Sequence, residues 1–172
     1  IFDVVRVPIH GGSLRIFAAH SMVAERRQSV NDLLEEEDNW GVATTQGYQA
    51  FAQRVAHLKQ SLVETLQTLK SQGKRIAVYG ASAKGSTLLN TFGITHELID
   101  FVVDRSTVKQ GLYTPGTHLH IKPPSALLDE QPDAVLLLTW NFAEEILAQQ
   151  AEYIARGGKF IIPLPEVRIV PA

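Results

Sequence analysis

From Gly73 onward the sequence alternates short apolar runs with amphipathic segments, and this alternation is the strongest constraint on the fold. Runs that are apolar along their whole length are typical of parallel strands buried between two layers of helices. Right-handed crossovers then favour one strand order, 3-2-1-4-5. The sequence therefore predicts an α/β, Rossmann-like, doubly wound and mostly parallel sheet. The predicted strands are 75–79, 98–103, 118–121, 134–139 and 159–162, and the predicted helices are 84–92, 124–128 and 142–156.

The first part of the chain has a different pattern. Two β-rich runs, 2–9 and 13–20, flank His10-Gly11-Gly12 and predict a hairpin, and a short helix is expected over 24–38. A long amphipathic helix should follow from about Thr45 to Gln72, because apolar residues recur there at helical spacing, and Gly73 should stop it. The apolar stripe of this long helix is Phe51, Val55, Leu58, Leu62, Leu66 and Leu69. We expect an N-terminal β arm with a short helix, 1–43, as a linker from a preceding domain, and a Rossmann-like domain over 44–172.

Charge and composition narrow the class of protein. The 172 residues carry 16 Lys and Arg against 18 Asp and Glu, and aromatic residues are not interleaved with basic clusters, so a nucleic-acid partner is not expected. No apolar stretch has the length of a membrane span and no signal peptide is recognisable, which predicts a cytoplasmic protein without a membrane partner. The chain opens within a β-rich run without an initiator Met, so we expect a piece of a longer protein.

The segment YGASAKGST, residues 79–87, follows the first predicted strand of the sheet. It contains the glycines, the lysine and the hydroxyls of a phosphate-binding loop, but it matches neither the P-loop nor the dinucleotide fingerprint, because Ser82 takes the place of the middle glycine. Gly80 would allow a tight turn and Gly85 a close approach of the helix to the sheet. Free amides from Lys84 to Thr87 at the helix start would then favour an anionic ligand. Ser82, Ser86 and Thr87 would add hydroxyl donors. The alternative is a glycine-rich turn with capping hydroxyls and a solvated lysine.

Other candidates lie where ligands bind in such sheets, outside the carboxyl ends of the strands. Asp104 follows the second strand, at the position where dinucleotide folds hold ribose hydroxyls. Lys109 could meet a phosphate or be solvated, and Tyr113 could stack on a base or pack on the sheet edge. Trp140 and Asn141 should face the glycine-rich loop across the crevice, although Trp140 could also be part of the core. The candidate substrate-binding residues are Gly80, Ser82, Ala83, Lys84, Gly85, Ser86, Thr87, Asp104, Lys109, Tyr113, Trp140 and Asn141.

A metal site is not expected. The chain has no Cys. His118 and His120 share one face of a predicted strand, the spacing of two metal ligands, but no third ligand lies near them in the sequence. We interpret both as structural residues.

Five segments together resemble the C-terminal domain of the S-adenosylmethionine-dependent sugar C-methyltransferases, which act on nucleotide-linked deoxysugars. These segments are VPIHGGSLR (7–15), YGASAKGSTLLN (79–90), DRSTVKQGLYTPGTH (104–118), TWNFAEEI (139–146) and GGKFIIPLPE (157–166). The resemblance covers nearly the whole chain. It implies a transferase whose zinc module and methyltransferase domain precede this part, so that S-adenosylmethionine, zinc and the catalytic residues belong to those domains.

The resemblance further implies that this fragment holds the nucleotide-linked sugar, contacts its own methyltransferase domain, needs no cofactor of its own and is inactive alone. Two alternatives stay open. One is a dinucleotide- or coenzyme A-binding domain of a dehydrogenase or sensor, which the missing middle glycine disfavours. The other is a packing module without a ligand, which the polar loop disfavours.

Overall fold

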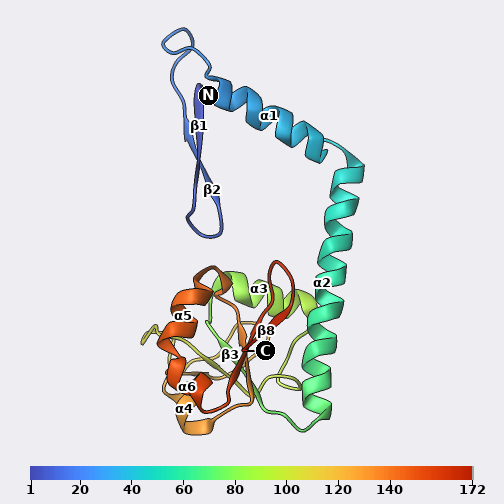
Figure 1. Cartoon of the computed structure of the whole chain (residues 1–172), viewed down its shortest axis with the longest axis vertical. Helices are drawn as coiled ribbons and strands as arrows, with labels where there is room; N and C mark the ends of the chain where they lie inside the picture. Colours follow the sequence, from blue (N-terminus) through green and yellow to red (C-terminus); the bar gives the residue numbers. More distant parts are fainter. Residues whose placement is uncertain (172) are drawn as a thin grey trace. The chain divides into compact units, whose positions relative to one another are not determined.

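The computed structural model of the chain describes residues 1–171 (Figure 1). It divides into two compact units, Ile1–Val55 and the remainder from Ala56 onward. Each unit is described by itself below.

The first unit contains the predicted hairpin, followed by a helix. Strands β1 (Asp3–Val7) and β2 (Ser13–Phe17) pair antiparallel with Val5 opposite Arg15. The helix α1 (Gln28–Trp40) starts and ends later than the sequence suggested, and Gly41 closes it in the left-handed conformation. Asp3 ties the hairpin to the start of α1, since it accepts hydrogen bonds of 2.7 Å from both Ser29 Oγ and Arg27 Nη1. The Ser29 hydroxyl and the Arg27 guanidinium hold the pKa of Asp3 below its usual value.

The long helix α2 (Thr45–Ser71) has nearly the predicted bounds. Its first turns belong to the first unit and the rest to the second unit, where Leu62 and Leu66 are fully buried. Gly73, in the left-handed conformation at φ 75°, follows its end, as expected.

The second unit is built on one six-stranded sheet with the order β5-β4-β3-β6-β7-β8. The first five strands in this order are parallel and β8 runs antiparallel to β7. The mostly parallel α/β class expected from the sequence is thus confirmed. The strands are β3 (Ile76–Tyr79), β4 (Phe101–Val103), β5 (Ile121–Lys122), β6 (Ala134–Leu137), β7 (Lys159–Ile162) and β8 (Arg168–Val170).

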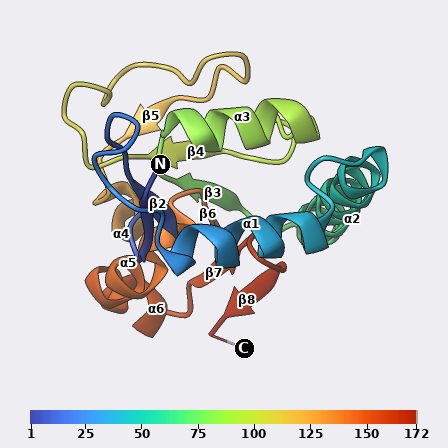
Figure 2. The same cartoon turned by 90° about the horizontal axis from the view of Figure 1, so that it is seen from above.

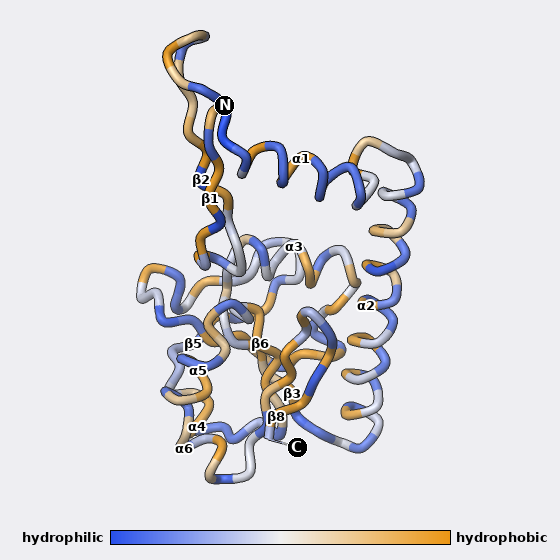
Figure 3. Tube along the Cα trace, turned by 45° about the horizontal axis from the view of Figure 1, so that its top comes forward, coloured by the Kyte–Doolittle hydropathy of each residue, from blue (hydrophilic) through white to orange (hydrophobic). Residues whose placement is uncertain are grey.

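Helices cover both faces of this sheet (Figure 2). One face packs against α4 (Ala126–Glu130), α5 (Ala143–Gln149) and α6 (Ala151–Ala155), and the side chains of Tyr79 and Leu137 point into this layer. The other face lies toward α3 (Ala83–Phe92) and the second half of α2. All four residues of the central strand β6 are buried, which confirms the burial expected for that strand. The hydropathy of the chain shows the same apolar centre (Figure 3).

Three local predictions were wrong. The strand expected over 118–121 is only β5, because His118 adopts a left-handed φ of 52° and donates its N–H to the Thr114 carbonyl, within a turn. The helix expected over 142–156 begins with a 3₁₀ turn, η1 (Trp140–Phe142), and divides into α5 and α6 at Gln150, whose backbone leaves the helical region. Finally, β8 had no counterpart in the prediction.

Among residues 1–171, no helix combines the length and the apolar character that crossing a membrane would require.

Candidate functional site

The glycine-rich loop and Trp140 lie at the carboxyl ends of two neighbouring strands. β3 and β6 pair directly, with Tyr79 opposite Leu137, so the segments that follow them emerge at the same edge of the sheet. The ammonium group of Lys84 lies 4.6 Å from the centroid of the Trp140 ring, a cation–π contact. The structure therefore brings Lys84 and Trp140 together, as the sequence suggested for this crevice.

Both glycines of the loop are required by close contacts. Gly80 has a φ of 100°, and a Cβ there would lie 2.7 Å from Thr139 Cγ2. A Cβ on Gly85 would lie 2.8 Å from both Cβ and Cδ1 of Leu138. The roles predicted for these two residues, a tight turn and a close packing of helix on sheet, agree with this geometry.

The hydrogen bonds at the start of α3 correct the prediction of free amides from Lys84 to Thr87. Ser82 is the N-cap residue, and its hydroxyl accepts the N–H of Gly85 at 3.0 Å. The N–H of Ser86 already donates to the Ser82 carbonyl. The Thr87 hydroxyl donates to the Ala83 carbonyl at 3.1 Å. Since a helix leaves its first N–H groups unpaired, the amides of Ala83 and Lys84 are the ones left to meet a ligand.

The Asp104 carboxylate stabilises the conformation of the glycine-rich loop through two backbone hydrogen bonds. One carboxylate oxygen accepts the N–H of Ala81 at 2.7 Å and the other accepts the N–H of Ser106 at 2.8 Å. Lys109 joins them, donating to the Ala81 carbonyl at 2.9 Å and lying 3.5 Å from the Asp104 carboxylate. The Lys109 side chain is still 43% exposed, so it combines this structural contact with access to solvent, and its phosphate-binding role stays a prediction. Together, Asp104 and Lys109 fasten the glycine-rich loop to the end of β4.

The rest of the long connection after β4 turns back over α3. The Asn90 amide donates to the Pro115 carbonyl at 3.1 Å. Tyr113 is half exposed, and its ring stacks on His118 at a centroid distance of 4.5 Å and contacts His120 at 5.3 Å. These contacts give both histidines a packing role beside Tyr113. Within residues 1–171, no group of three or more His, Cys, Asp or Glu side chains is arranged to hold a metal ion.

A pocket of about 240 Å³ opens beside this crevice on the α5 side of the sheet. Gly80 and Asp104 were predicted from the sequence, whereas the other lining residues were not. The complete lining is Tyr79, Gly80, Asp104, Arg105, Thr139, Phe142, Glu145 and Ile146. A signal for two of them was available, because Tyr79 and Thr139 are hydroxyl-bearing residues at the ends of otherwise aliphatic strands. Asn141, which was predicted, is partly buried in η1 but does not line this pocket.

Two hydroxyl groups of the pocket, those of Tyr79 and Thr139, are buried without a hydrogen bond of ordinary length among the described residues. Leaving such a group unpaired costs about 1–3 kcal/mol of stability, so native proteins contain few of them. Burial raises the pKa of Tyr79, and the charge of Arg105 and the nearby Gln150 side chain oppose this less strongly. Arg105 also lies 3.6 Å from the Glu145 carboxylate, so the rim of the pocket carries charges of both signs.

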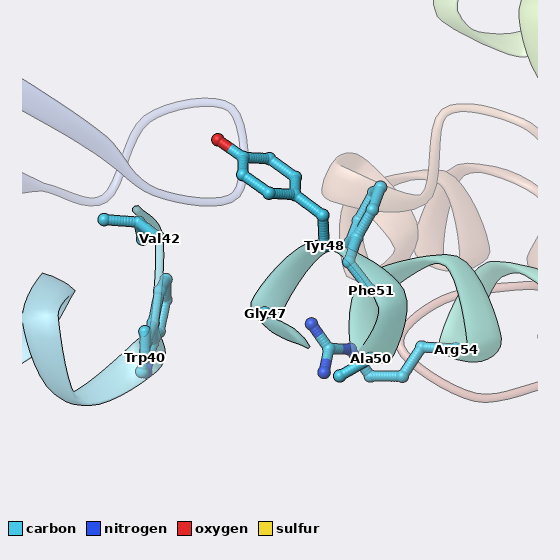
Figure 4. A pocket seen from close by; sticks show the side chains of 7 residues that line it. All are labelled: Trp40, Val42, Gly47, Tyr48, Ala50, Phe51 and Arg54. Atoms are coloured by element: carbon cyan, nitrogen blue, oxygen red, sulfur yellow. The ribbon is translucent and has the colours of Figure 1, made fainter. Parts of the chain in front are cut away.

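A larger hollow lies in the first unit, at the end of α1 and the start of α2 (Figure 4). Its wall is aromatic, and the side chains of Trp40, Tyr48 and Phe51 are 71%, 65% and 57% exposed. The Arg54 guanidinium lies 5.9 Å from the Phe51 ring centroid. Exposed apolar groups gathered in this way are typical of surfaces that contact another protein or domain.

Comparison with known proteins agrees with the resemblance seen in the sequence. Residues 8–165 match the family described as the C-methyltransferase C-terminal domain. The chain is 38% identical over 173 aligned positions to the C-methyltransferase NovU of Streptomyces niveus. The alignment covers 100% of this chain but only 41% of that protein, so the chain spans less than half the length of its relative. The chain belongs to the C-methyltransferase C-terminal domain family.

Proposed function

We propose that this chain is the part of an S-adenosylmethionine-dependent sugar C-methyltransferase that binds and positions the nucleotide-linked deoxysugar. We also assign it a Rossmann-like doubly wound fold, which the strand order and the helices on both faces of the sheet support. The single observation that carries the binding role is the meeting of Lys84 with Trp140 beside the start of α3. A mobile cation, two amides at a helix N-terminus and an aromatic face form a combination suited to a diphosphate and an adjoining ring.

The site supports a dinucleotide less well. Ser82 occupies the position where a dinucleotide loop has glycine, and its hydroxyl is used in capping α3. Asp104, which would have to hold a ribose, already accepts two backbone N–H groups. These two assignments favour a nucleotide-sugar over a nicotinamide cofactor at this crevice.

Methyl transfer itself would take place elsewhere in the enzyme. The family name implies S-adenosylmethionine as the methyl donor, and the chain spans only 41% of its relative, which leaves room for further domains in such an enzyme. In keeping with the family resemblance, we propose that the cofactor, the zinc and the acid–base residues belong to those other domains, and we expect the isolated chain to be inactive.

The partner that we propose is the methyltransferase domain of the same enzyme. The aromatic hollow of Trp40, Tyr48 and Phe51 provides an apolar surface for such a contact. A packing module without a ligand would use the same surface, so only a binding measurement at the crevice separates the two functions.

That measurement uses Lys84→Ala. Trp140 fluorescence, isolated by Trp40→Phe because the chain has two Trp residues, should report titration with uridine or thymidine diphosphate glucose. A charge-assisted contact contributes about 1.5–3 kcal/mol, so Lys84→Ala should weaken binding about ten- to a hundredfold. The matched control is Lys159→Ala, which removes an exposed lysine at the opposite, amino end of a parallel strand. If Lys84→Ala binds these sugars as tightly as Lys159→Ala, or if neither sugar binds the unaltered chain, the proposed site is wrong.

A further inference from the structure

The pocket beside the crevice suggests which part of the ligand lies there. It is continuous with the proposed site through Gly80, because the turn at Gly80 both leads into the glycine-rich loop and lines the pocket. The inference below rests on the proposed function, since it assumes that a nucleotide-sugar occupies the crevice.

The pocket has hydrogen-bonding groups that the protein does not use. The Tyr79 side chain points into the layer between the sheet and α5, and the residue is 3% exposed. Its hydroxyl has no hydrogen bond of ordinary length among the described residues, although the Gln150 side chain is near enough to oppose the rise in its pKa that burial causes. The Thr139 hydroxyl is equally unpaired. A Cβ at position 80 would lie 3.2 Å from this buried Thr139 oxygen, so the oxygen lies directly beside the turn at Gly80. Each hydroxyl can donate one hydrogen bond and accept others, so a ligand that both donates and accepts would satisfy them.

The charges of the pocket disfavour a phosphate. Asp104 and Glu145 contribute two carboxylates, whereas Arg105 is the one cationic residue of the lining and lies 3.6 Å from Glu145. There is consequently no surplus of positive charge, and a neutral group is better tolerated than a diphosphate. The exposed Phe142 side chain and the buried Ile146 add apolar surface suited to the face of a planar ring.

The ligand has two neutral ends, the sugar and the base. The size of the pocket and the location of the reaction decide which of them lies here. The sugar has to reach a methyl donor held by another domain, so the end that does not react is the one that can be buried here. The volume of about 240 Å³ lies below the roughly 300–1,000 Å³ of pockets for drug-sized ligands, which favours a single ring over a fused pair.

We propose that the pocket of Tyr79, Thr139 and Phe142 binds the pyrimidine base of the nucleotide-sugar. The imide of uracil or thymine offers carbonyl oxygens and an N–H, which match the unused hydroxyls of Tyr79 and Thr139. The base ring would lie against Phe142, and the diphosphate would extend past Gly80 to Lys84 and the amides of Ala83 and Lys84.

The test compares Tyr79→Phe with Tyr153→Phe. Tyr153 is also buried in this layer, but its hydroxyl donates to the Pro132 carbonyl at 2.7 Å. Loss of one neutral hydrogen bond should make Tyr79→Phe bind UDP and dTDP about two- to tenfold more weakly, with binding of inorganic diphosphate unchanged. Thermal unfolding gives an independent measurement: removing an unpaired buried hydroxyl should leave the melting temperature equal or higher, whereas Tyr153→Phe should lower it and leave UDP affinity unchanged. Thr139→Val removes the second hydroxyl and should reproduce the binding result of Tyr79→Phe.

Each remaining outcome has a definite meaning. Unchanged UDP and dTDP affinity in both Tyr79→Phe and Thr139→Val, while Lys84→Ala still weakens diphosphate binding, overturns the base pocket but leaves the proposed function standing. A loss confined to the glucose-bearing ligands would place the sugar in the pocket, and tighter binding of ADP or GDP than of UDP and dTDP would exclude a pyrimidine site; either result overturns the inference. If the chain binds no nucleotide at all, the proposed function fails and the inference fails with it.

Discussion

Replacement of Gly85 by valine tests how closely α3 approaches the sheet, on which the whole site depends. The ideal Cβ at this position lies 2.8 Å from Leu138 Cβ and Cδ1 and 3.1 Å from Ser82 Oγ. Carbon atoms in ordinary contact are about 3.5–4.0 Å apart, so the helix or Leu138 has to move by roughly 1 Å. Leu138 is 1% exposed and follows the central strand β6, so it has little room to move.

The expected cost follows from three contributions. Overpacking of this kind costs about 1–3 kcal/mol. The two methyl groups of valine crowd the Ser82 cap, whose loss costs about 1 kcal/mol, and valine recovers a few tenths of a kcal/mol in helix propensity over glycine. We therefore expect Gly85→Val to reduce the free energy of unfolding by about 2–4 kcal/mol.

Urea unfolding followed by far-UV circular dichroism measures this change directly. The matched control is Thr91→Val, which introduces valine at an exposed position of the same helix and should stay within about 0.5 kcal/mol of the unaltered chain. At temperatures where the variant is folded, Gly85→Val should also bind nucleotide-sugar more weakly, because the displaced helix start misplaces the amides of Ala83 and Lys84. A Gly85→Val protein as stable as Thr91→Val would show that α3 does not pack this closely on Leu138, and the geometry proposed for the crevice would be wrong.

Two further predictions concern acid stability and the methyl donor. Hydrogen bonds from Lys122 and Arg75 lower the pKa of Glu130 from its usual 4.5, and those from Lys74 and the Arg75 N–H lower the pKa of Asp133 from 3.8. Because both folded-state pKa values are lowered, this stabilisation is present above the ordinary carboxyl values and is lost as pH falls through the folded ones. The measurement is urea unfolding at about pH 6 and at about pH 3, an interval that spans the ordinary pKa values of carboxyl groups. The free energy of unfolding should fall less between these pH values for Asp133→Asn than for the exposed control Asp129→Asn, and equal decreases would contradict the reasoning. Isothermal calorimetry of the chain with S-adenosylmethionine should detect no binding, and micromolar affinity would refute the assignment of the methyl donor to another domain.

The sequence alone was sufficient to predict those elements that depend on a local pattern of residues. The apolar run of β6 predicts a strand buried on both faces, and helical spacing places α2 within a residue of its observed end. Gly80 and Gly85 could be interpreted for the same reason, since a turn after a strand and a close helix require residues without a side chain. The antiparallel β8 was missed because it is only three residues long and begins with a charged residue, so its sequence pattern is weak and its strand character comes from pairing with β7.

The hydrogen-bond partners of the site residues depended much more on the tertiary structure. Sequence placed Asp104 and Lys109 near a ligand, but only the fold shows that the Asp104 oxygens are taken by the N–H groups of Ala81 and Ser106 and that Lys109 holds the Ala81 carbonyl. Likewise, Tyr79 is simply the last residue of an apolar run until β3, β6 and α5 enclose its hydroxyl without a hydrogen bond of ordinary length among the described residues. A residue type and its spacing determine what a side chain can donate or accept. Which of these hydrogen bonds are already satisfied depends on groups brought together from distant parts of the chain, and only the tertiary structure decides that.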